Sequence, residues 1–499
     1  MLLPWLTLFD FANFRANFKK PIDLKKVKER SDDFALLVPI FNDLKYLTNV
    51  EFLKLYSNHV ILCTTTHETP EFVEALESLA QEYGFRTTYS LIEGTAKNPW
   101  AIYHKTLLAH DFVLKRTIHT ITEKYVIFVD GDTYVAEDLA VLTGSMEQYG
   151  FDISSVKILP SRRKTIIEQL QGVEYDIAMR ARLIYPWLTS GAGMIARREV
   201  MNAVMENHSL FFNGGDIEIG KLAHMMGYKV GHIPVVFYTD IPSSFRKWIN
   251  QRRSWTCGMF RHAVVNADLN LWYPFHFIYY SIVIYLLYPI KVLEILSHIH
   301  LVPLIMTLYV MATVLANWKV RSRWMLIFPP YALFQVLVVV WLGLYRYLNT
   351  IVKTGNFGKI RIHYNPNPYL HRLRNSVGRM AKNFIFILVS VLAITFAAID
   401  SIQHIMLQQS DPVIAFLQGI VWRVASFLEK ILGVFALSPI ETIGVMGILL
   451  LLGLITGIIT LRSIPSRPVR RAAVRVSART LLVRARYPYG LRTGSRAQV

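Results

Sequence analysis

Residues Phe245 to Met259 read FRKWINQRRSWTCGM, and this stretch divides the chain into two halves of different character. Before it, short apolar segments alternate with polar ones, whereas apolar runs of about twenty residues follow position 270. Its arginines and the tryptophans Trp248 and Trp255 stand at helical spacing and form a basic, aromatic face. Such a face suits an interfacial anchor helix or a phosphate-bearing ligand, and both interpretations are open from this stretch alone.

The composition indicates a soluble domain followed by a membrane domain. Of the 499 residues, 53% are hydrophobic, which is too apolar for one soluble globular protein. The formal net charge is +19. In a membrane protein such an excess of Lys and Arg marks cytoplasmic, lipid-facing segments, so nucleic-acid binding is not expected. Cys63 and Cys257 both fall in the part expected in the cytosol, where they should be reduced thiols.

The chain is expected to contain five consecutive regions. They are an interfacial amphipathic anchor with a basic linker at 1–30, an α/β domain at 31–245, an interfacial helix with the QRRSW motif at 246–270, transmembrane and interfacial helices at 271–461, and an Arg-rich cytosolic tail at 462–499.

In the first half, short apolar strands alternate with helical stretches. Strands are expected at 34–43, 60–63, 86–92 and 125–129, and helices at 70–83 and 98–115. This alternation predicts a largely parallel α/β sheet. Because ligands bind at the carboxyl ends of the strands in such sheets, Asp130 and Asp132, which follow the strand 125–129, should lie at the binding edge.

The segment Asp130-Gly131-Asp132-Thr133 carries the first candidate chemistry. Two carboxylates one residue apart, with a glycine that permits a tight turn, can bind a hard divalent cation such as Mg²⁺ or Mn²⁺ together with the phosphates of a ligand. An ordinary Asp-Gly turn is the alternative.

A second small-residue segment is Ser190-Gly191-Ala192-Gly193. Residues without bulky side chains allow a ligand to approach the backbone closely. The alternative is a tight loop that leads into a strand.

The third candidate is Asp216, which follows a glycine pair at 214–215. The sequence after it predicts a helix that ends near Gly227. An acid at the start of a helix is either an N-terminal cap or, beside a pocket, a general base.

The order of the motifs carries a resemblance. The chain reads VPIFND at 38–43, DGDT at 130–133, SGAG at 190–193, GGD at 214–216 and QRRSW at 251–255, followed by apolar helices. This order resembles the processive, membrane-embedded family 2 glycosyltransferases, namely the cellulose, chitin and hyaluronan synthases. The resemblance implies an α/β domain of the GT-A type followed by an α-helical transmembrane domain with interfacial helices. It also implies an inverting transfer of sugar from a nucleotide-sugar donor.

By position, the resemblance implies a role for each motif. Asp216 would be the general base, and Asp132 would bind Mg²⁺ or Mn²⁺. The donor would contact Pro39, Asn42, Lys97, Asp130, Gln251, Arg252 and Arg253. The acceptor would contact Ser190, Gly191, Ala192, Gly193 and Trp255. Related synthases carry arginine where this chain has Ser254, so Arg253 is expected to supply that charge.

The resemblance implies a synthase that elongates a β-linked polysaccharide and passes it across the membrane. Two alternatives remain: a non-processive lipid glucosyltransferase of the ceramide type, and a transporter or scaffold with a catalytically inactive domain, against which the ordered acids argue. The expected partners are a nucleotide-sugar, with UDP-sugars preferred to GDP-sugars, a glycan or lipid acceptor, and membrane lipids.

Apolar segments follow at 274–292, 299–317, 326–345, 383–400 and 441–461. Basic clusters at 319–323, at 346–382 and beyond Arg462 predict cytoplasmic sequence there. Since one span at 326–345 cannot have cytoplasmic sequence on both sides, one of the first three segments should be re-entrant or interfacial, and Pro329-Pro330 favours the third. An integral protein of the plasma membrane with a cytosolic catalytic domain is expected.

Overall fold

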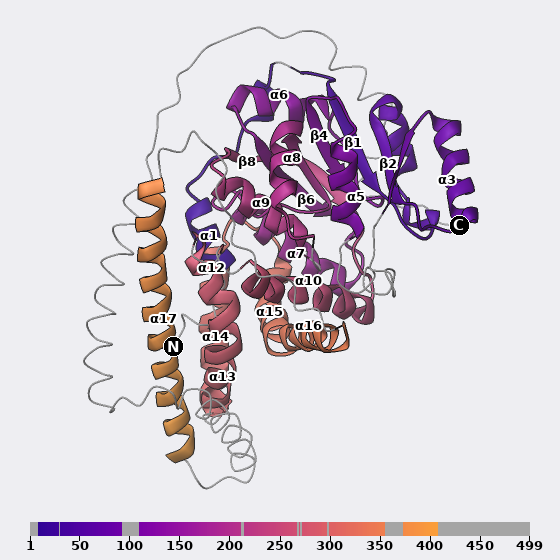
Figure 1. Cartoon of the computed structure of the whole chain (residues 1–499). Helices are drawn as coiled ribbons and strands as arrows, with labels where there is room; N and C mark the ends of the chain where they lie inside the picture. The colour runs from indigo at the N-terminus through magenta and orange to yellow at the C-terminus, as the bar shows by residue number, and fades with distance from the viewer. Residues whose placement is uncertain are drawn as a thin grey trace, which may run out of the picture.

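The computed structural model describes residues 8–28, 30–91, 109–210, 214–266, 269, 272–296, 299–354 and 373–407. A sheet domain forms one end of the molecule, and helices from the second half of the chain extend away from it (Figure 1). Helix α10 (Phe245–Val265), which contains the stretch that divides the sequence, lies between these two parts. The implied donor contact Lys97, the apolar segment 441–461 and the tail from Arg462 all lie outside the described residues.

The domain is built on one eight-stranded sheet with the order β3-β2-β1-β4-β7-β6-β8-β5. The strands are β1 (Phe34–Pro39), β2 (Val60–Thr65), β3 (Arg86–Ser90), β4 (Tyr125–Val129), β5 (Tyr134–Val135), β6 (Ile153–Pro160), β7 (Gly193–Arg197) and β8 (Val230–Thr239). Strands β3, β2, β1 and β4 are parallel, as the alternation of strands and helices predicts. In β1, Leu36 and Val38 enter one hydrophobic core and Leu37 enters the other, which explains the continuous apolar run.

The prediction of a largely parallel sheet is confirmed only in part, because the sheet is mixed. Strand β7 is antiparallel to both β4 and β6, and β5 is antiparallel to β8, whereas β6 and β8 are parallel. The physical reason lies in where β7 begins. Its first residue, Gly193, pairs with Val129, the last residue of β4, so the chain enters β7 at the edge where β4 ends. The loop 190–193 therefore lies beside the carboxyl end of β4.

Helices cover the sheet: α3 (Pro70–Tyr83), α5 (Ala109–Ile118), α6 (Ala140–Tyr149), α7 (Ile166–Ala181), α8 (Arg198–Asn207) and α9 (Gly215–Met225). Helix α3 has the predicted bounds, because Thr69 accepts a hydrogen bond from the amide of Phe72 at one end and Gly84, with φ of 72°, ends it at the other. Of the helix predicted at 98–115, residues 98–108 lie outside the described residues, and α5 contains the remainder.

Helix α1 (Leu8–Ala16) turns its polar side toward the protein. Asp10 and Asn13 are buried: the side chain of Asn317 donates to Asp10 Oδ1 (2.6 Å), and Asn13 Nδ2 donates to the carbonyl of Ile177 (2.9 Å). The aromatic side chains Phe11, Phe14 and Phe18 are exposed. This reversed polarity joins α1 to α7 and to the end of α14 (Val302–Ala316) through buried hydrogen bonds.

The second half of the chain contains α12 (Pro274–Ile278), the π-helical segment η4 (Tyr279–Leu287), α13 (Tyr288–Leu296), α14, α15 (Phe328–Phe334), η7 (Gln335–Val339), α16 (Val340–Thr354) and α17 (Leu373–Leu407). Two helical stretches in the described part are long and apolar enough to cross a membrane, Phe328–Thr350 and Ala381–Ser401. The helices Pro274–Tyr285 and Tyr288–Ile295 meet at an angle of 43°, and together they are long and apolar enough to form a third span. Helix α14 is shorter, at 15 residues.

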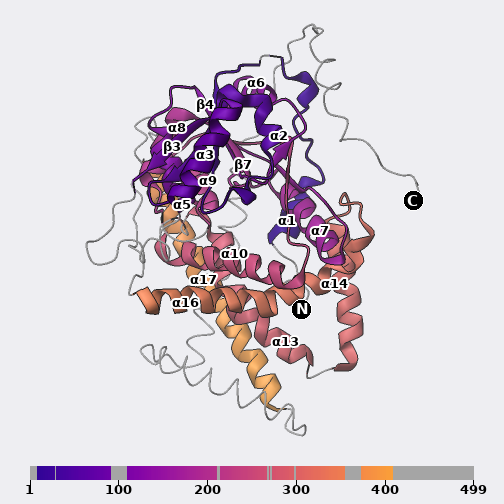
Figure 2. The same cartoon turned by 90° about the vertical axis from the view of Figure 1, so that its right-hand side faces the viewer.

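The apolar stretch Phe328–Thr350 differs from the others in direction. Helix α16 runs across α14 and α17, whereas it lies alongside α10 (Figures 1 and 2). At the contact with α10, a Cβ added to Gly343 would come within 2.0 Å of Thr256 Oγ1. The same hydroxyl lies 3.4 Å from the carbonyl oxygen of Val339 and donates to it. Glycine at 343 therefore permits the close approach of α16 to α10.

We expect Gly343→Leu to force α16 away from α10, because no space exists for a side chain there. Overpacking of this kind costs about 1–3 kcal/mol of stability, so the midpoint of thermal unfolding of the purified full chain should fall. Tyr345→Leu is the matched control, because Tyr345 is exposed on the same helix. An unchanged midpoint for Gly343→Leu would show that the two helices can separate freely.

Candidate active site

The turn after β4 packs against the loop that contains Tyr46 and Asn49. Asn49 Nδ2 donates to the carbonyl of Asp130 (3.0 Å) and to that of Thr133 (2.5 Å). A Cβ on Gly131 would meet the carbonyl oxygen of Tyr46 at 3.0 Å, so the loop packs tightly against the turn. These contacts fix Asp130 and Asp132 at the carboxyl edge of the sheet, where the sequence places them.

The carboxylate of Asp132 is surrounded by few groups that favour its charge. Burial and the nearby Asp130 raise the pKa of Asp132 to about 6, and Asp240 adds to this effect. The hydroxyls of Thr133 and Thr239 each donate to Asp132 Oδ1 at 3.2 Å and act in the opposite direction. The carboxyl groups of Asp130, Asp132 and Asp240 thus lie near one another at this edge of the sheet. A bound cation would stabilise their negative charges.

The residues fit a divalent cation that is shared with a ligand. Among the described residues, no three His, Cys, Asp or Glu side chains gather where they could hold a metal ion by themselves. Mg²⁺ typically binds to one or two carboxylates and completes its coordination with substrate phosphates and water. Asp132, with Asp130 beside it, offers that partial set of ligands.

Asp130 belongs to a chain of charged side chains that reaches helix α9. His110 Nε2 lies 3.5 Å from Asp130 Oδ1, and His110 Nδ1 lies 2.9 Å from Asp111 Oδ1. Burial lowers the pKa of His110, but the two carboxylates outweigh it and raise that pKa to about 10. Asp111 in turn lies behind the start of α9, where a Cβ on Gly215 would overlap its Oδ2 at 1.6 Å.

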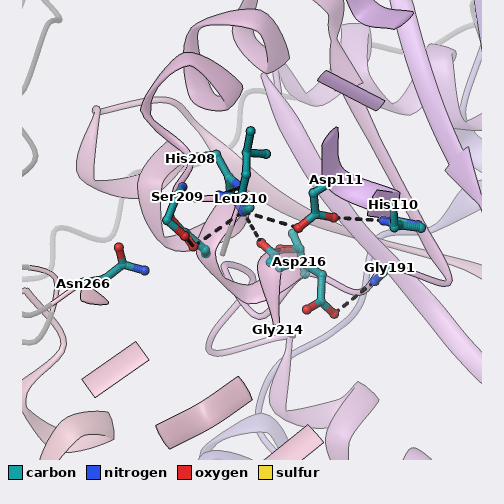
Figure 3. A network of polar contacts seen from close by, with 12 residues as sticks. His110, Asp111, Gly191, His208, Ser209, Leu210, Gly214, Asp216 and Asn266 are labelled. Atoms are coloured by element: carbon teal, nitrogen blue, oxygen red, sulfur yellow. Dashed lines mark hydrogen bonds and ion pairs between the residues drawn. The ribbon is translucent and has the colours of Figure 1, made fainter. Parts of the chain in front are cut away.

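Asp216 lies in the first turn of α9, where its carboxylate also interacts with the backbone amide of Ile217. The N-cap position belongs to Gly214, which has φ of 89° and no capping side chain, so the interpretation of Asp216 as an N-cap is wrong. Instead, Asp216 Oδ2 accepts a hydrogen bond from the amide of Gly191 (3.0 Å), as Figure 3 shows. The hydroxyl of Thr189 donates to the carbonyl of Asp216. The loop that contains Gly191 and the acid Asp216 therefore form one unit.

A buried polar network contacts the first turn of α9, next to Asp216 (Figure 3). His208 Nε2 donates to the carbonyl of Gly215 (3.0 Å), and the amide of Ser209 donates to Glu218 Oε1 (2.7 Å). Arg261 of α10 forms a 2.5 Å ion pair with Glu218, and both side chains are completely buried. Burial raises the pKa of Glu218, but Arg261, the neighbouring His208 and His262, and the hydrogen bond from Ser209 together outweigh it and hold that pKa well below its usual range. Helix α9 is thereby fastened to α10.

The QRRSW motif lies on α10, and its two arginines have different surroundings. Arg252 is 2% exposed, and its guanidinium is bonded to Glu174 Oε2 (2.7 Å) and to Gln251 Oε1 (2.8 Å). Arg253 is less buried. Trp255 remains 44% exposed, with the Arg252 guanidinium 4.0 Å from its ring centroid.

Electrostatic coupling joins the three parts of the edge. The hydroxyl of Tyr175 is influenced by Asp132, Glu174 and Arg252 at once, although burial is the main cause that raises its pKa to about 12. Arg182, which is buried, is coupled to Asp216 and Tyr175 in the same way. The predicted metal ligand, the predicted base and the QRRSW helix are therefore neighbours.

The other predicted donor residues lie at the end of β1. Pro39 is the last residue of that strand. Asn42 has φ of 64°, and its backbone N–H donates a hydrogen bond to Glu68 Oε2 (2.9 Å). Sequence reasoning did not select several residues that shape the site, namely His110, Asp111, Arg182, His208, Glu218, Thr239 and Arg261. Each acts through contacts with distant parts of the chain, and we find no local pattern that distinguishes them.

No curated protein matches the chain by sequence. Solved structures of similar arrangement include the mannosyltransferase PcManGT from Pyrobaculum calidifontis in complex with GDP-Man and Mn²⁺ (14% identity, 70% of this chain and 93% of that one, TM-score 0.39). Others are glucosyl-3-phosphoglycerate synthase from Mycobacterium tuberculosis in complex with Mn²⁺ and UDP-glucose (15%, 48% and 83%, 0.30) and TarS 1-349 from S. aureus (14%, 65% and 92%, 0.29).

A family model described as Glycosyl transferase family group 2 matches residues 125–334. The matched segment begins at β4 and includes the DGDT turn, the loop 190–193, Asp216 and the QRRSW motif. This match supports a family 2 glycosyltransferase domain in the chain.

Proposed function

We propose that the protein is a membrane-embedded, inverting glycosyltransferase that transfers sugar from a nucleotide-sugar to a growing β-linked polysaccharide and translocates the product. One observation carries the proposal. The turn 130–133, the loop 190–193 and Asp216 meet at a single edge of the sheet, because β7 begins where β4 ends and Asp216 binds the amide of Gly191. An acid pair that can hold a divalent cation for a diphosphate, a small-residue loop and a separate carboxylate are the parts that such a transfer requires.

In this proposal Asp216 is the general base. It would accept the proton of the acceptor hydroxyl as that oxygen attacks the anomeric carbon from the side opposite the leaving diphosphate. Burial and the nearby Asp111 raise its pKa, while the Gly191 amide and Arg182 act in the opposite direction. A carboxylate that holds a proton more tightly than an exposed aspartate is the stronger base for this step.

Donor binding is assigned to Pro39, Asn42, Lys97, Asp130, Gln251, Arg252 and Arg253, with Asp132 as the ligand of Mg²⁺ or Mn²⁺. The cation, when bound, supplies positive charge that stabilises the leaving diphosphate. Of the two arginines, Arg253 is the better candidate for the same purpose, because Glu174 already occupies the guanidinium of Arg252. The Nε atoms of Arg252 and Arg253 are both buried without a hydrogen-bond partner among the described residues, so the ion pair with Glu174 is what distinguishes the two arginines.

Acceptor binding is assigned to Ser190, Gly191, Ala192, Gly193 and Trp255. The exposed ring of Trp255 suits a sugar face, since aromatic rings pack against the apolar C–H surface of pyranoses. The loop 190–193 would bring an acceptor hydroxyl within reach of Asp216.

We propose that the protein resides in the plasma membrane with its catalytic domain in the cytosol, and three features support the membrane location itself. Two stretches have the length and composition of membrane spans. Helix α1 hides its polar side and exposes phenylalanines, an arrangement that favours an apolar surrounding. The stretch Phe328–Thr350 runs across α17, so if α17 crosses the bilayer, α16 lies along its surface, which suits the interfacial position predicted from Pro329-Pro330.

The proposal is tested with the purified full chain in detergent and a panel of UDP- and GDP-sugars, with Mg²⁺ or Mn²⁺. Nucleotide release and product size are measured. We expect release from at least one UDP-sugar and a product of polymer length. A product with a single added sugar on a lipid would favour the ceramide-type alternative. No release from any donor would contradict the proposal.

We expect Asp216→Asn to bind donor nucleotide normally but to lower turnover by about 10²–10⁴-fold, because an amide cannot accept the acceptor proton. Nucleotide affinity by calorimetry and turnover by nucleotide release separate the two effects. Near wild-type turnover of this variant would remove Asp216 from the mechanism.

Asp132→Asn should reduce metal-dependent turnover by about 10²-fold or more, because it removes a charged ligand of the cation. The amide oxygen can still accept from Thr133 and Thr239, so the thermal midpoint should not change. Titration of activity with Mn²⁺ measures the effect. A variant that retains both turnover and stimulation by Mn²⁺ would exclude Asp132 as a ligand.

The acid limb of the pH profile should report Asp216. Asp111→Asn removes a negative charge that disfavours the ionised Asp216, so the pKa of Asp216 should fall and activity should persist to lower pH. Glu71→Gln, at an exposed site on α3, is the control. An acid limb of kcat/KM that stays in place or moves to higher pH in Asp111→Asn would show that another group controls it.

A further inference from the structure

Glu174 of α7 joins the catalytic domain to two other helices through one oxygen. Its Oε2 accepts a hydrogen bond from Arg252 of α10 (2.7 Å) and another from the hydroxyl of Tyr331 of α15 (2.8 Å). The hydroxyl of Tyr331 in turn accepts from the indole nitrogen of Trp248 (2.8 Å), a completely buried residue of α10. Three helices therefore meet in one continuous hydrogen-bonded network.

This network determines what Arg252 can reach. The guanidinium is almost completely buried, and it is bonded to Glu174 on one side and to Gln251 on the other. Its planar face lies 4.0 Å from the ring centroid of Trp255, the distance of a cation–π contact. Arg252 thus contacts the ring of Trp255, whose side chain is 44% exposed and whose ring centroid lies 6.5 Å from that of Tyr175.

Tyr331 brings the apolar half of the chain into this arrangement. It lies directly after Pro329-Pro330, in the stretch Phe328–Thr350 that has the composition of a membrane segment. Its ring packs against Trp248 (5.2 Å between centroids) and Phe328 (5.7 Å), while its hydroxyl reaches Glu174. Packing and hydrogen bonding are therefore separate contributions of this side chain.

We propose that Glu174 and Tyr331 are positioning residues that hold Arg252 beneath Trp255 and so orient the acceptor platform from the membrane side of the molecule. The inference rests on the proposed function, in which Trp255 binds the acceptor sugar. It moves Arg252 from the donor-binding set proposed above to the acceptor side, because Arg252 is paired with Glu174, and leaves Arg253 for the donor diphosphate. Helix α15, which belongs to the apolar half of the chain, thereby sets the position of Trp255 beside the catalytic domain.

Tyr331→Phe is the most direct test, because it removes the hydroxyl and keeps the ring. The loss leaves Trp248 without its acceptor and Glu174 with one donor fewer. With the donor that gives the highest nucleotide release, we expect an unchanged donor KM, a fall in kcat of about tenfold and shorter products, since a hydrogen bond to a charged group is worth about that factor. Tyr345→Phe, at an exposed tyrosine of α16, is the matched control and should behave as wild type.

Glu174→Gln is the second variant. It keeps an acceptor oxygen for Tyr331 but removes the charge that pairs with Arg252, so the same split between kcat and donor KM should be larger. Thermal midpoints of all variants are measured in parallel. Two results overturn the inference: variants that fold and keep the wild-type kcat and product length, and variants that all fail to fold, since the network would then be a structural element only.

The outcomes for the inference and for the proposed function are distinct. A wild-type protein that releases no nucleotide from any donor contradicts the proposed function. An active wild-type protein with unaltered Tyr331→Phe and Glu174→Gln variants contradicts this inference alone. If Tyr331→Phe does not fold, Glu174→Gln decides the question.

Discussion

Two ion pairs fix helix α10, and the arrangement of the site depends on them. Arg252 is paired with Glu174 of α7, which is partly exposed, and Arg261 is paired with Glu218 of α9 in a completely buried pair. Breaking the buried Arg261–Glu218 pair by the loss of one partner costs about 3–5 kcal/mol, because the remaining charge stays buried. Helix α10 therefore cannot shift relative to α7 or α9 without exposing charges or leaving them unpaired. The positions of Trp255 on one helix and Asp216 on another follow from this constraint.

The same helix connects the sheet domain to the apolar half. On its other side α10 meets α16, where Gly343 allows contact with Thr256, and α15, where Tyr331 bonds to Trp248. Helix α1 makes a second connection through its buried polar side. The two halves are thus joined by specific hydrogen bonds in addition to apolar packing, which gives a physical route by which the helices of the apolar half can influence the site.

Local patterns predicted the elements well. The strand at 125–129 and the helix at 70–83 have the expected bounds, because burial of both faces of a strand and a Thr–Pro start with a Gly end are written in adjacent residues. The position of the DGDT turn followed from the same logic, since an acid directly after a parallel strand must lie at its carboxyl edge.

What could not be predicted depends on partners far apart in sequence. The antiparallel entry of β7 arises from its pairing with β4, and the pairing of Arg252 with Glu174 spans 78 residues. The resemblance placed Arg252 on the donor side by its position in the QRRSW motif, and Arg253 as the substitute for an arginine at Ser254, because the pairing of Arg252 with Glu174 is not visible in the local sequence. Helix α1 was expected to be amphipathic, but only the tertiary contacts of Asp10 and Asn13 reveal that its polar side faces the protein.

The central claim is that one edge of the sheet binds a nucleotide diphosphate between Asp132 and Arg253 while Arg252 stays with Glu174. An experimental structure of the full chain in lipid nanodiscs with UDP and Mn²⁺ tests it most directly. The account predicts Mn²⁺ in contact with Asp132 and the diphosphate, the Arg253 guanidinium beside the phosphates, and an intact Arg252–Glu174 pair. Nucleotide bound away from Asp132, or Arg252 released from Glu174 to bind the diphosphate, would contradict it.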